Sequence, residues 1–191
     1  MSPQEEHAMK RIAVVVGNPK PASRTLGAAV AVADALALAL PKPAGPTGDA
    51  PAEPTGAPGD HLVVDLAEHA GRLFDWADPG LSRLTSEVAA SGLAVFASPT
   101  YKASYTGMLK AFLDRYGPDG LAGTVAIPLM TGGLPGHALA VEVHLRPVLI
   151  ELGASVPARG LYLTEPEFAD LDAPVTRWST TALPLISAAL A

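Results

Sequence analysis

The sequence has no cysteine among its 191 residues. This absence excludes disulfide bonds, iron–sulfur clusters, cysteine-ligated zinc and thiol catalysis, and it suits a reducing compartment such as the cytoplasm. Positive charge is also scarce, because 13 lysines and arginines stand against 19 acidic residues and give a net charge of -6. A basic face for nucleic acid is therefore not expected.

Long apolar runs and clustered metal ligands are missing as well. A membrane-spanning helix needs about 20 consecutive apolar residues, whereas the nearest candidate, residues 28–40, is shorter and contains Asp34. Residues 1–7 are polar and acidic, without the basic-then-apolar order of a secretory signal. The five histidines have no ligand-like spacing, so no metal site is expected. We expect a cytoplasmic protein without a membrane segment.

What is present is a regular alternation of short apolar runs with helix-like segments. Hydrophobic residues make up 49% of the chain, which is ample for a packed core. The pattern predicts an α/β fold with one parallel sheet and helices on both faces. Five strands suit the order 2-1-3-4-5, whose ligand crevice lies between strands one and three. Strands are expected at 12–16, 62–66, 93–97, 124–130 and 159–163, and helices at 25–40, 81–90, 106–115, 137–152 and 173–189.

Residues 41–60 interrupt this alternation. Six prolines and four glycines in this stretch exclude a helix or a strand. We interpret it as a tolerated loop insertion in a single domain over residues 9–191, preceded by a flexible N-terminus at 1–8. A lid or a tether for a partner is the alternative. Deleting residues 44–57 should leave folding and ligand binding intact if the insertion is merely tolerated.

The first loop, residues 17–25, lies between the first strand and the first helix. Backbone N–H groups at a helix N-terminus favour a phosphate, and hydroxyl and guanidinium groups add hydrogen bonds to it. The loop is neither a P-loop nor a Gly-x-Gly-x-x-Gly motif. An ordinary turn in which Ser23 caps the helix is the alternative. The candidate ligands are Asn18, Lys20, Ser23, Arg24 and Thr25.

Two further loops follow strands three and four. In the second loop, residues 98–106, Pro99 and Tyr101 could cover a planar ligand while backbone amides bind its polar rim. The alternative is that its tyrosines only pack over the start of a helix. In the third loop, residues 131–137, adjacent glycines would let the backbone approach a ring edge, or would simply make a flexible turn. Lys110 and Asp114 are four residues apart and predict a local salt bridge.

These loops resemble those of NAD(P)H-dependent FMN reductases with a flavodoxin-like fold. The second loop and the helix after it follow that family's pattern Pro-x-Tyr-(Asn/Lys)-x-Ser-x-x-Gly-x-Leu-Lys, and the first loop is similar to its phosphate loop, with Asn18 in place of the usual Ser. The resemblance implies that the second loop lies along the isoalloxazine ring and ribityl chain, and that the third meets the pyrimidine side. The residues it adds to the candidate set are Pro99, Thr100, Tyr101, Lys102, Ser104, Thr131, Gly132 and Gly133.

Residues 98–153 are most similar to the subgroup that supplies reduced FMN to sulfonate monooxygenases. The shared stretches are Pro-Leu-Met-Thr-Gly-Gly at 128–133, His-Ala-Leu-Ala at 137–140 and Leu-Arg-Pro-Val-Leu at 145–149. The resemblance implies a three-layer flavodoxin-like sandwich, FMN with NADPH or NADH, a partner monooxygenase, and a homodimer or homotetramer. No protein acid or base is required for hydride transfer, so no catalytic residue is assigned.

One departure concerns the fourth helix. The alkanesulfonate-linked reductases carry a tyrosine there, associated with a π-bulge and with oligomer packing, whereas residues 142–145 of this chain read Glu-Val-His-Leu. The bulge is therefore not predicted, and His144 is either a substitute for the tyrosine or, as we favour, a helix-surface or interface residue. Two other functions stay open: a quinone or azo reductase that keeps its FMN bound, and a flavodoxin-like electron carrier. The sequence does not choose between NADH and NADPH.

Overall fold

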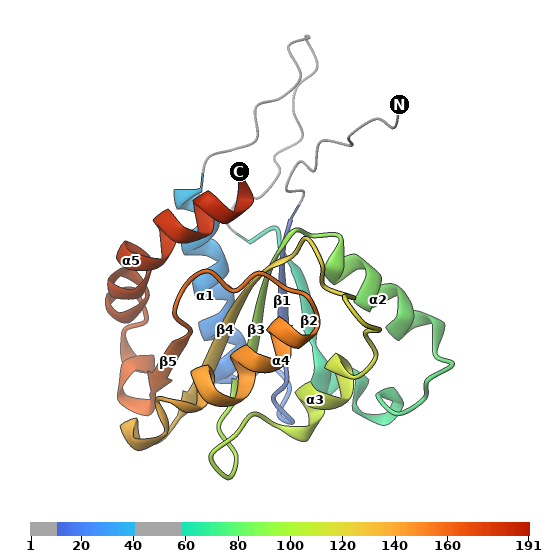
Figure 1. Ribbon diagram of the computed structural model, residues 1–191. Coiled ribbons are helices and arrows are strands. Elements are labelled where there is room, and N and C mark those ends of the chain that lie inside the picture. The colour runs from blue at the N-terminus through green and yellow to red at the C-terminus, as the bar shows by residue number, and fades with distance from the viewer. Residues whose placement is uncertain (1–10, 41–58) are drawn as a thin grey trace, which may run out of the picture.

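The computed structural model describes residues 11–40 and 59–191 (Figure 1). The predicted flexible N-terminus at 1–8 lies outside the described residues, as does all but the end of the 41–60 insertion. Both interpretations of that insertion, and the single domain over 9–191, stay predictions.

Five parallel strands form one sheet in the order β2-β1-β3-β4-β5, which confirms the predicted topology. All strands run downward in the view of Figure 1, so their carboxyl ends share the lower edge of the molecule. Every residue of the central strands β1 and β3 is buried, because helices cover both faces of the sheet. The strands are β1 (Ile12–Val16), β2 (Leu62–Asp65), β3 (Leu93–Pro99), β4 (Val125–Gly132) and β5 (Leu161–Thr164).

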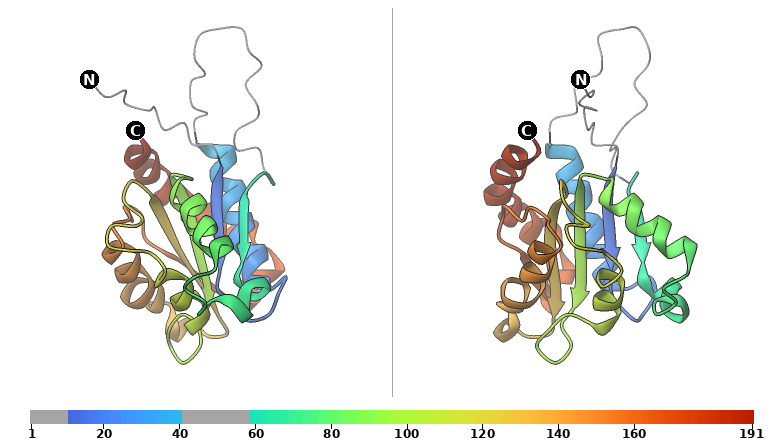
Figure 2. Two further views of the ribbon diagram at one scale, coloured as in Figure 1. Left: turned by 90° about the vertical axis from the view of Figure 1, so that its right-hand side faces the viewer. Right: turned by 45° about the vertical axis from the view of Figure 1, so that its right-hand side comes forward.

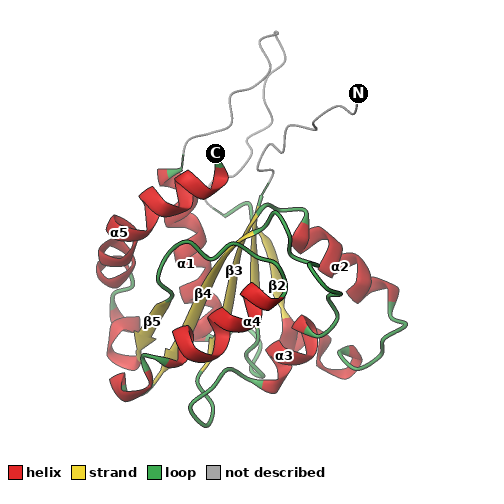
Figure 3. Ribbon diagram, viewed as in Figure 1, coloured by secondary structure: helices red, strands yellow, loops and turns green. Residues whose placement is uncertain are grey.

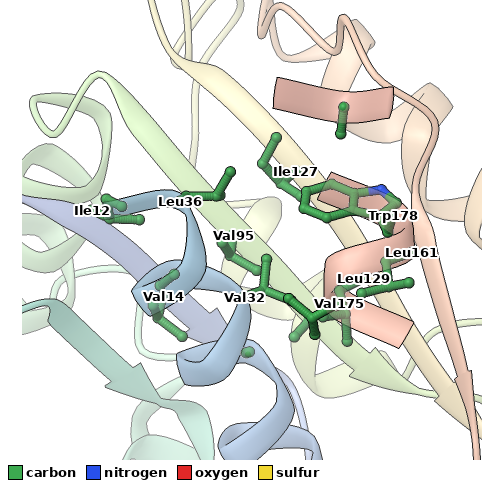
Figure 4. Packing of buried hydrophobic residues seen from close by; sticks show 14 of the residues in the cluster. Ile12, Val14, Val32, Leu36, Val95, Ile127, Leu129, Leu161, Val175 and Trp178 are labelled. Atoms are coloured by element: carbon green, nitrogen blue, oxygen red, sulfur yellow. The ribbon is translucent and has the colours of Figure 1, made fainter. Parts of the chain in front are cut away.

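The helices form two layers (Figures 1 and 2). Helices α1 and α5 cover one face of the sheet, and α2, α3 and α4 cover the other. On the α1/α5 face, Val32 and Leu36 of α1 and Trp178 of α5 belong to one hydrophobic cluster with side chains of the central strands (Figure 4). The helices are α1 (Arg24–Ala39), α2 (Pro79–Ala89), α3 (Gly107–Leu113), α4 (Arg146–Glu151) and α5 (Asp172–Leu190).

The predicted fourth helix over 137–152 is wrong as one continuous α-helix. The chain instead forms a short 3₁₀ turn, η2 (Pro135–His137), then a π-helical turn, η3 (Val141–Leu145), and only then α4. The π-bulge that the missing tyrosine left unpredicted is therefore present, and His144 lies within it. Single π-turns inside α-helices are frequent at functional sites.

Pro128 lies inside β4, although β4 is not an edge strand. The N–H of Ala126 is donated to Ser155 O on the β5 side, at 2.8 Å. Alternation along the strand turns the nitrogen of Pro128 to the same side, where β5 pairs only from Leu161 onward. The missing N–H of the proline therefore lies at a position where no paired β5 residue would accept it.

Smaller differences from the prediction lie at element ends. β4 continues through Gly132, so Thr131 and Gly132 belong to the strand rather than to the third loop. A 3₁₀ helix that was not predicted, η1 (Leu66–Arg72), follows β2, and α2 begins at Pro79 with Asp78 as its N-cap. No described helix is long and apolar enough to cross a bilayer.

Candidate functional site

A cleft of about 320 Å³ lies at the carboxyl edge of the sheet, where the loops after β1, β3 and β4 meet. These loops are green along the lower edge of Figure 3. All the predicted site residues line the cleft except Lys102 and Ser104, and two residues that were not predicted, Glu165 and Phe168, complete its wall. The lining residues are Asn18, Lys20, Ser23, Arg24, Thr25, Pro99, Thr100, Tyr101, Thr131, Gly132, Gly133, Glu165 and Phe168.

The first loop is held in one shape by side chains that bond its own backbone. Ser23 is the N-cap of α1, and its Oγ accepts the Leu26 N–H at 3.2 Å. Asn18 Oδ1 accepts the Lys20 N–H at 3.0 Å. Asp65, at the end of β2, accepts the Ala22 N–H at 3.0 Å. The backbone N–H groups at the start of α1 are thus presented at the cleft, where they suit an anion.

A short chain of hydroxyls joins the first loop to β4. Thr25 Oγ1 lies 3.0 Å from Thr131 Oγ1, and Asn18 Nδ2 donates to Thr25 Oγ1 at 3.1 Å. Both threonines are buried, with 2% and 4% of their surface exposed. The N-terminus of α1 is therefore fixed relative to the sheet by polar contacts inside the cleft itself.

The second loop is fixed to the first by Thr106. Its Oγ1 donates to Gly17 O at 2.5 Å and also accepts the Leu109 N–H at 3.2 Å, which caps α3. Gly17 must be a glycine, because a Cβ at this position would lie 2.4 Å from Leu109 Cβ. The loops after β1 and β3 therefore touch directly at the predicted crevice.

The tip of the second loop is a strained two-residue turn. Tyr101 and Ser104 exchange backbone hydrogen bonds at 2.8 and 3.1 Å. Lys102 and Ala103 between them have φ of 52° and 66°, which is the type I′ geometry that normally takes Asn-Gly. The turn leaves Tyr101 54% exposed beside the cleft. Lys102 and Ser104 form this turn and do not line the cleft.

The end of β4 is packed against Tyr162 of β5. A Cβ on Gly132 would lie 2.1 Å from Tyr162 Oη, so a side chain there would displace the tyrosine hydroxyl. Tyr162 Oη donates to Leu134 O at 2.9 Å and so holds the third loop. The cleft beside this contact contains Thr100 Oγ1, a buried hydroxyl without a partner in the described part of the chain.

One ion pair spans the mouth of the cleft. Arg24 Nη2 donates to Glu165 Oε1 at 2.7 Å, and the guanidinium lies 5.1 Å from the ring centroid of Phe168. Both charged side chains are more than half exposed, at 65% and 60%. Glu165 was not predicted, since it lies 141 residues from Arg24 in a stretch that carries no ligand motif.

Other predicted groups lie away from the cleft. The predicted Lys110–Asp114 salt bridge is present, and the hydrogen bond to Asp114 raises the pKa of Lys110. His137 and His144 lie on the turns before α4 and do not line the cleft. Among the described residues no group of His, Asp or Glu side chains could hold a metal ion.

Residues 10–167 match the family of NADPH-dependent FMN reductases. The chain belongs to this family. The matched region begins just before β1 and ends in the turn that carries Glu165, so it includes every part of the cleft wall except Phe168.

Named relatives of this FMN reductase family member are similar over part of their length. The NADPH-dependent FMN reductase of Escherichia coli K12 is 37% identical over 92 residues, which is 48% of each chain. The NADH-dependent FMN reductase SfnF of Pseudomonas fluorescens is 34% identical over 122 residues, 58% of this chain and 64% of its own. This chain therefore spans about half the length of the curated relatives it matches.

Solved structures match over almost the whole fold. An NADH:FMN oxidoreductase in its apo form has a TM-score of 0.71 and 28% identity, covering 92% of this chain and 90% of its own. An oxidoreductase from Corynebacterium diphtheriae has a TM-score of 0.70 and 26% identity, covering 93% and 97%. The flavodoxin-like fold is thus shared over more than nine tenths of the chain.

Proposed function

We propose that this chain is an NAD(P)H-dependent FMN reductase whose flavin site is the cleft at the carboxyl edge of the sheet. The observation that carries the proposal is the convergence of three loops, after β1, β3 and β4, on one cleft in a chain of this family. That edge, at the point where strand order reverses, is where open α/β sheets bind their ligands.

The donor set of the cleft fits FMN. The N-terminus of α1, with the hydroxyls of Ser23 and Thr25, offers donors for a phosphate. Pro99 and Tyr101 offer an apolar and aromatic wall for a flat ring system. The orphaned hydroxyl of Thr100 and the backbone at Gly132 and Gly133 offer polar contacts to a ring edge.

The protein's part in the reaction is to bind and orient. FMN, when bound, supplies the hydride and electron chemistry, with NADPH or NADH as the reductant. Lys102 and Ser104 serve by forming the turn that presents Tyr101, rather than by lining the cleft. No side chain of the cleft needs to act as an acid or base, so no catalytic residue is proposed.

We further propose that the reduced flavin leaves for a partner monooxygenase and that the protein works as a homodimer or homotetramer in the cytoplasm. The similarity to SfnF, itself an FMN reductase, supports the flavin reductase role within this proposal. Leu139, in the turn before η3, Val143 of η3 and Ile150 of α4 are each more than half exposed, which supports association with another copy. Sedimentation of wild type and of Val143→Glu would test the oligomer, since a monomeric wild type contradicts it.

The experiment that tests the activity is NADPH and NADH oxidation by purified protein, with and without added FMN. Oxidation that requires FMN and saturates with it supports a reductase that uses flavin as a substrate. Oxidation without added FMN, stimulated by quinone, would favour the quinone or azo reductase. FMN binding without oxidation of either nucleotide would favour the electron carrier.

Two matched variants tie the activity to the cleft. Thr25→Val removes the hydroxyl that bonds Asn18 and Thr131 inside the cleft. Thr85→Val makes the same change on α2, where the hydroxyl donates to Ser82 O of its own helix. We expect the first variant to raise the KM for FMN about tenfold or more, as loss of one or two hydrogen bonds predicts, and the second to leave it unchanged. Equal effects would argue against this cleft as the flavin site.

A further inference from the structure

The cleft contains one carboxylate, that of Glu165, although the proposed ligand is itself an anion. Its charged lining residues are Lys20, Arg24 and Glu165. Glu165 bonds Arg24 directly and so neutralises one of the two positive charges that could face a phosphate at the start of α1. A site built only to hold FMN tightly would gain from the absence of this carboxylate.

The position of Glu165 is firmly set by its turn. It is the first residue of the 3₁₀ helix η4 (Glu165–Ala169), which begins with a capping box between Thr164 and Glu167. Glu167 Oε2 accepts both the N–H and the hydroxyl of Thr164, each at 2.8 Å. Phe168 of the same turn packs on the guanidinium of Arg24. The turn therefore presents two groups to Arg24 and keeps it on the β5 side of the cleft.

We propose that Glu165 is a positioning residue that holds Arg24 and thereby weakens the binding of the flavin phosphate. The inference rests on the proposed function and deepens it, because a reductase that hands over its flavin must also release it. Little free energy is lost when the exposed Arg24–Glu165 pair separates, since ion pairs in water contribute little. Arg24 can therefore exchange Glu165 for a phosphate when one binds.

The test compares FMN with riboflavin, which lacks the phosphate, by quenching of flavin fluorescence at fixed ionic strength. Glu165→Gln should tighten FMN about three- to fivefold, the range that an exposed ion pair can supply, and leave riboflavin unchanged. The same substitution in an Arg24→Gln background should have no effect on FMN, because Glu165 acts through Arg24. Glu87→Gln removes an equivalent exposed carboxylate, paired with Arg83 on α2, and should change neither ligand.

Each other outcome has a distinct meaning. Equal tightening of FMN and riboflavin by Glu165→Gln, or weaker FMN binding, would overturn the inference while leaving the proposed function in place. Persistence of the effect in the Arg24→Gln background would overturn the route through Arg24. If wild-type protein bound neither flavin, the proposed function would fall, and this inference with it.

Discussion

At the scale of single residues, Gly132 allows β4 to pack closely against Tyr162, so a substitution there should change the stability of the protein. A Cβ there would lie 2.1 Å from Tyr162 Oη, which holds the third loop through Leu134 O. Room for that Cβ requires Tyr162 to turn aside and give up its bond to Leu134 O, and the loss of one hydrogen bond costs about 1 kcal/mol. We expect Gly132→Ala to lower the free energy of unfolding by about 1 kcal/mol in urea titrations.

Two variants check the cause of that loss. In a Tyr162→Phe background the loss from Gly132→Ala should be smaller, because the clashing oxygen and its bond to Leu134 O are already removed. Gly133→Ala, one residue on, would meet no atom of the described residues within 4 Å, so its effect should stay within about 0.5 kcal/mol. Equal losses at the two glycines would contradict the packing argument.

Ala103 is one of four described non-glycine residues with a positive φ. Its φ of 66° lies in the left-handed region, which costs a residue with a Cβ about 1–2 kcal/mol. Glycine relieves that strain but gains entropy in the unfolded state, so we expect Ala103→Gly to stabilise the protein by about 0.5–1 kcal/mol. Ala35→Gly, inside α1, should instead destabilise it by about 1 kcal/mol. Thermal unfolding of both variants tests this opposite sign.

At the scale of elements, Arg146 fixes α4 to the segment that leads into β5. Its Nη1 donates to Ala158 O at 2.9 Å and its Nη2 to Val156 O at 2.7 Å. Hydrogen bonds from a charged group contribute about 1.5–3 kcal/mol, so Arg146→Met should lower the free energy of unfolding by about 2 kcal/mol. Arg146→Lys should recover less than half of this, because one ammonium lacks the fork that serves two carbonyls. Arg159→Met, at an exposed position, is the control and should be neutral.

The segment before α4 could be predicted from the sequence only in part. A π-turn and an α-turn differ by one residue in the hydrogen-bonded register, and the π-turn here still buries Val141 and Leu145, which are four residues apart. The apolar spacing at 137–152 therefore predicts a helix without revealing its interruption. β1 and β3 were predictable because their apolar runs are continuous and bounded by turn residues.

At the scale of the whole molecule, ligand binding should join segments that are distant in sequence. If FMN occupies the cleft, residues 17–25, 99–106 and 131–134 should gain protection from hydrogen exchange together, because all three loops belong to it. A stretch outside the cleft, residues 73–78, should not change. At a hundred times its Kd, FMN should also stabilise the protein by about 2.7 kcal/mol. Protection confined to the first loop would contradict a cleft shared by three.

The site as a whole was only partly predictable. Residues that follow β1, β3 and β4 were found because parallel strands end at one edge, so loop position alone indicates proximity. Glu165 and Phe168 were missed, since their turn follows the edge strand β5 and contains no glycine-rich or hydroxyl-rich motif. Their part in the cleft depends on the contact between Arg24, at the start of α1, and Glu165, at the start of η4. No local sequence pattern encodes a contact between two such distant residues.

The short edge strand β5 has a consequence for ligand exchange. It pairs with β4 at four positions, from Leu129 onward, whereas β3 and β4 pair at seven. The wall formed by Glu165 and Phe168 follows that lightly attached edge strand, whereas the Thr25–Thr131 contact belongs to the firm centre. Local opening of β5 would move Glu165 and Phe168 out of the cleft together, because both belong to the turn that directly follows this strand. The rate at which a flavin exchanges would then follow the fraying of an edge strand.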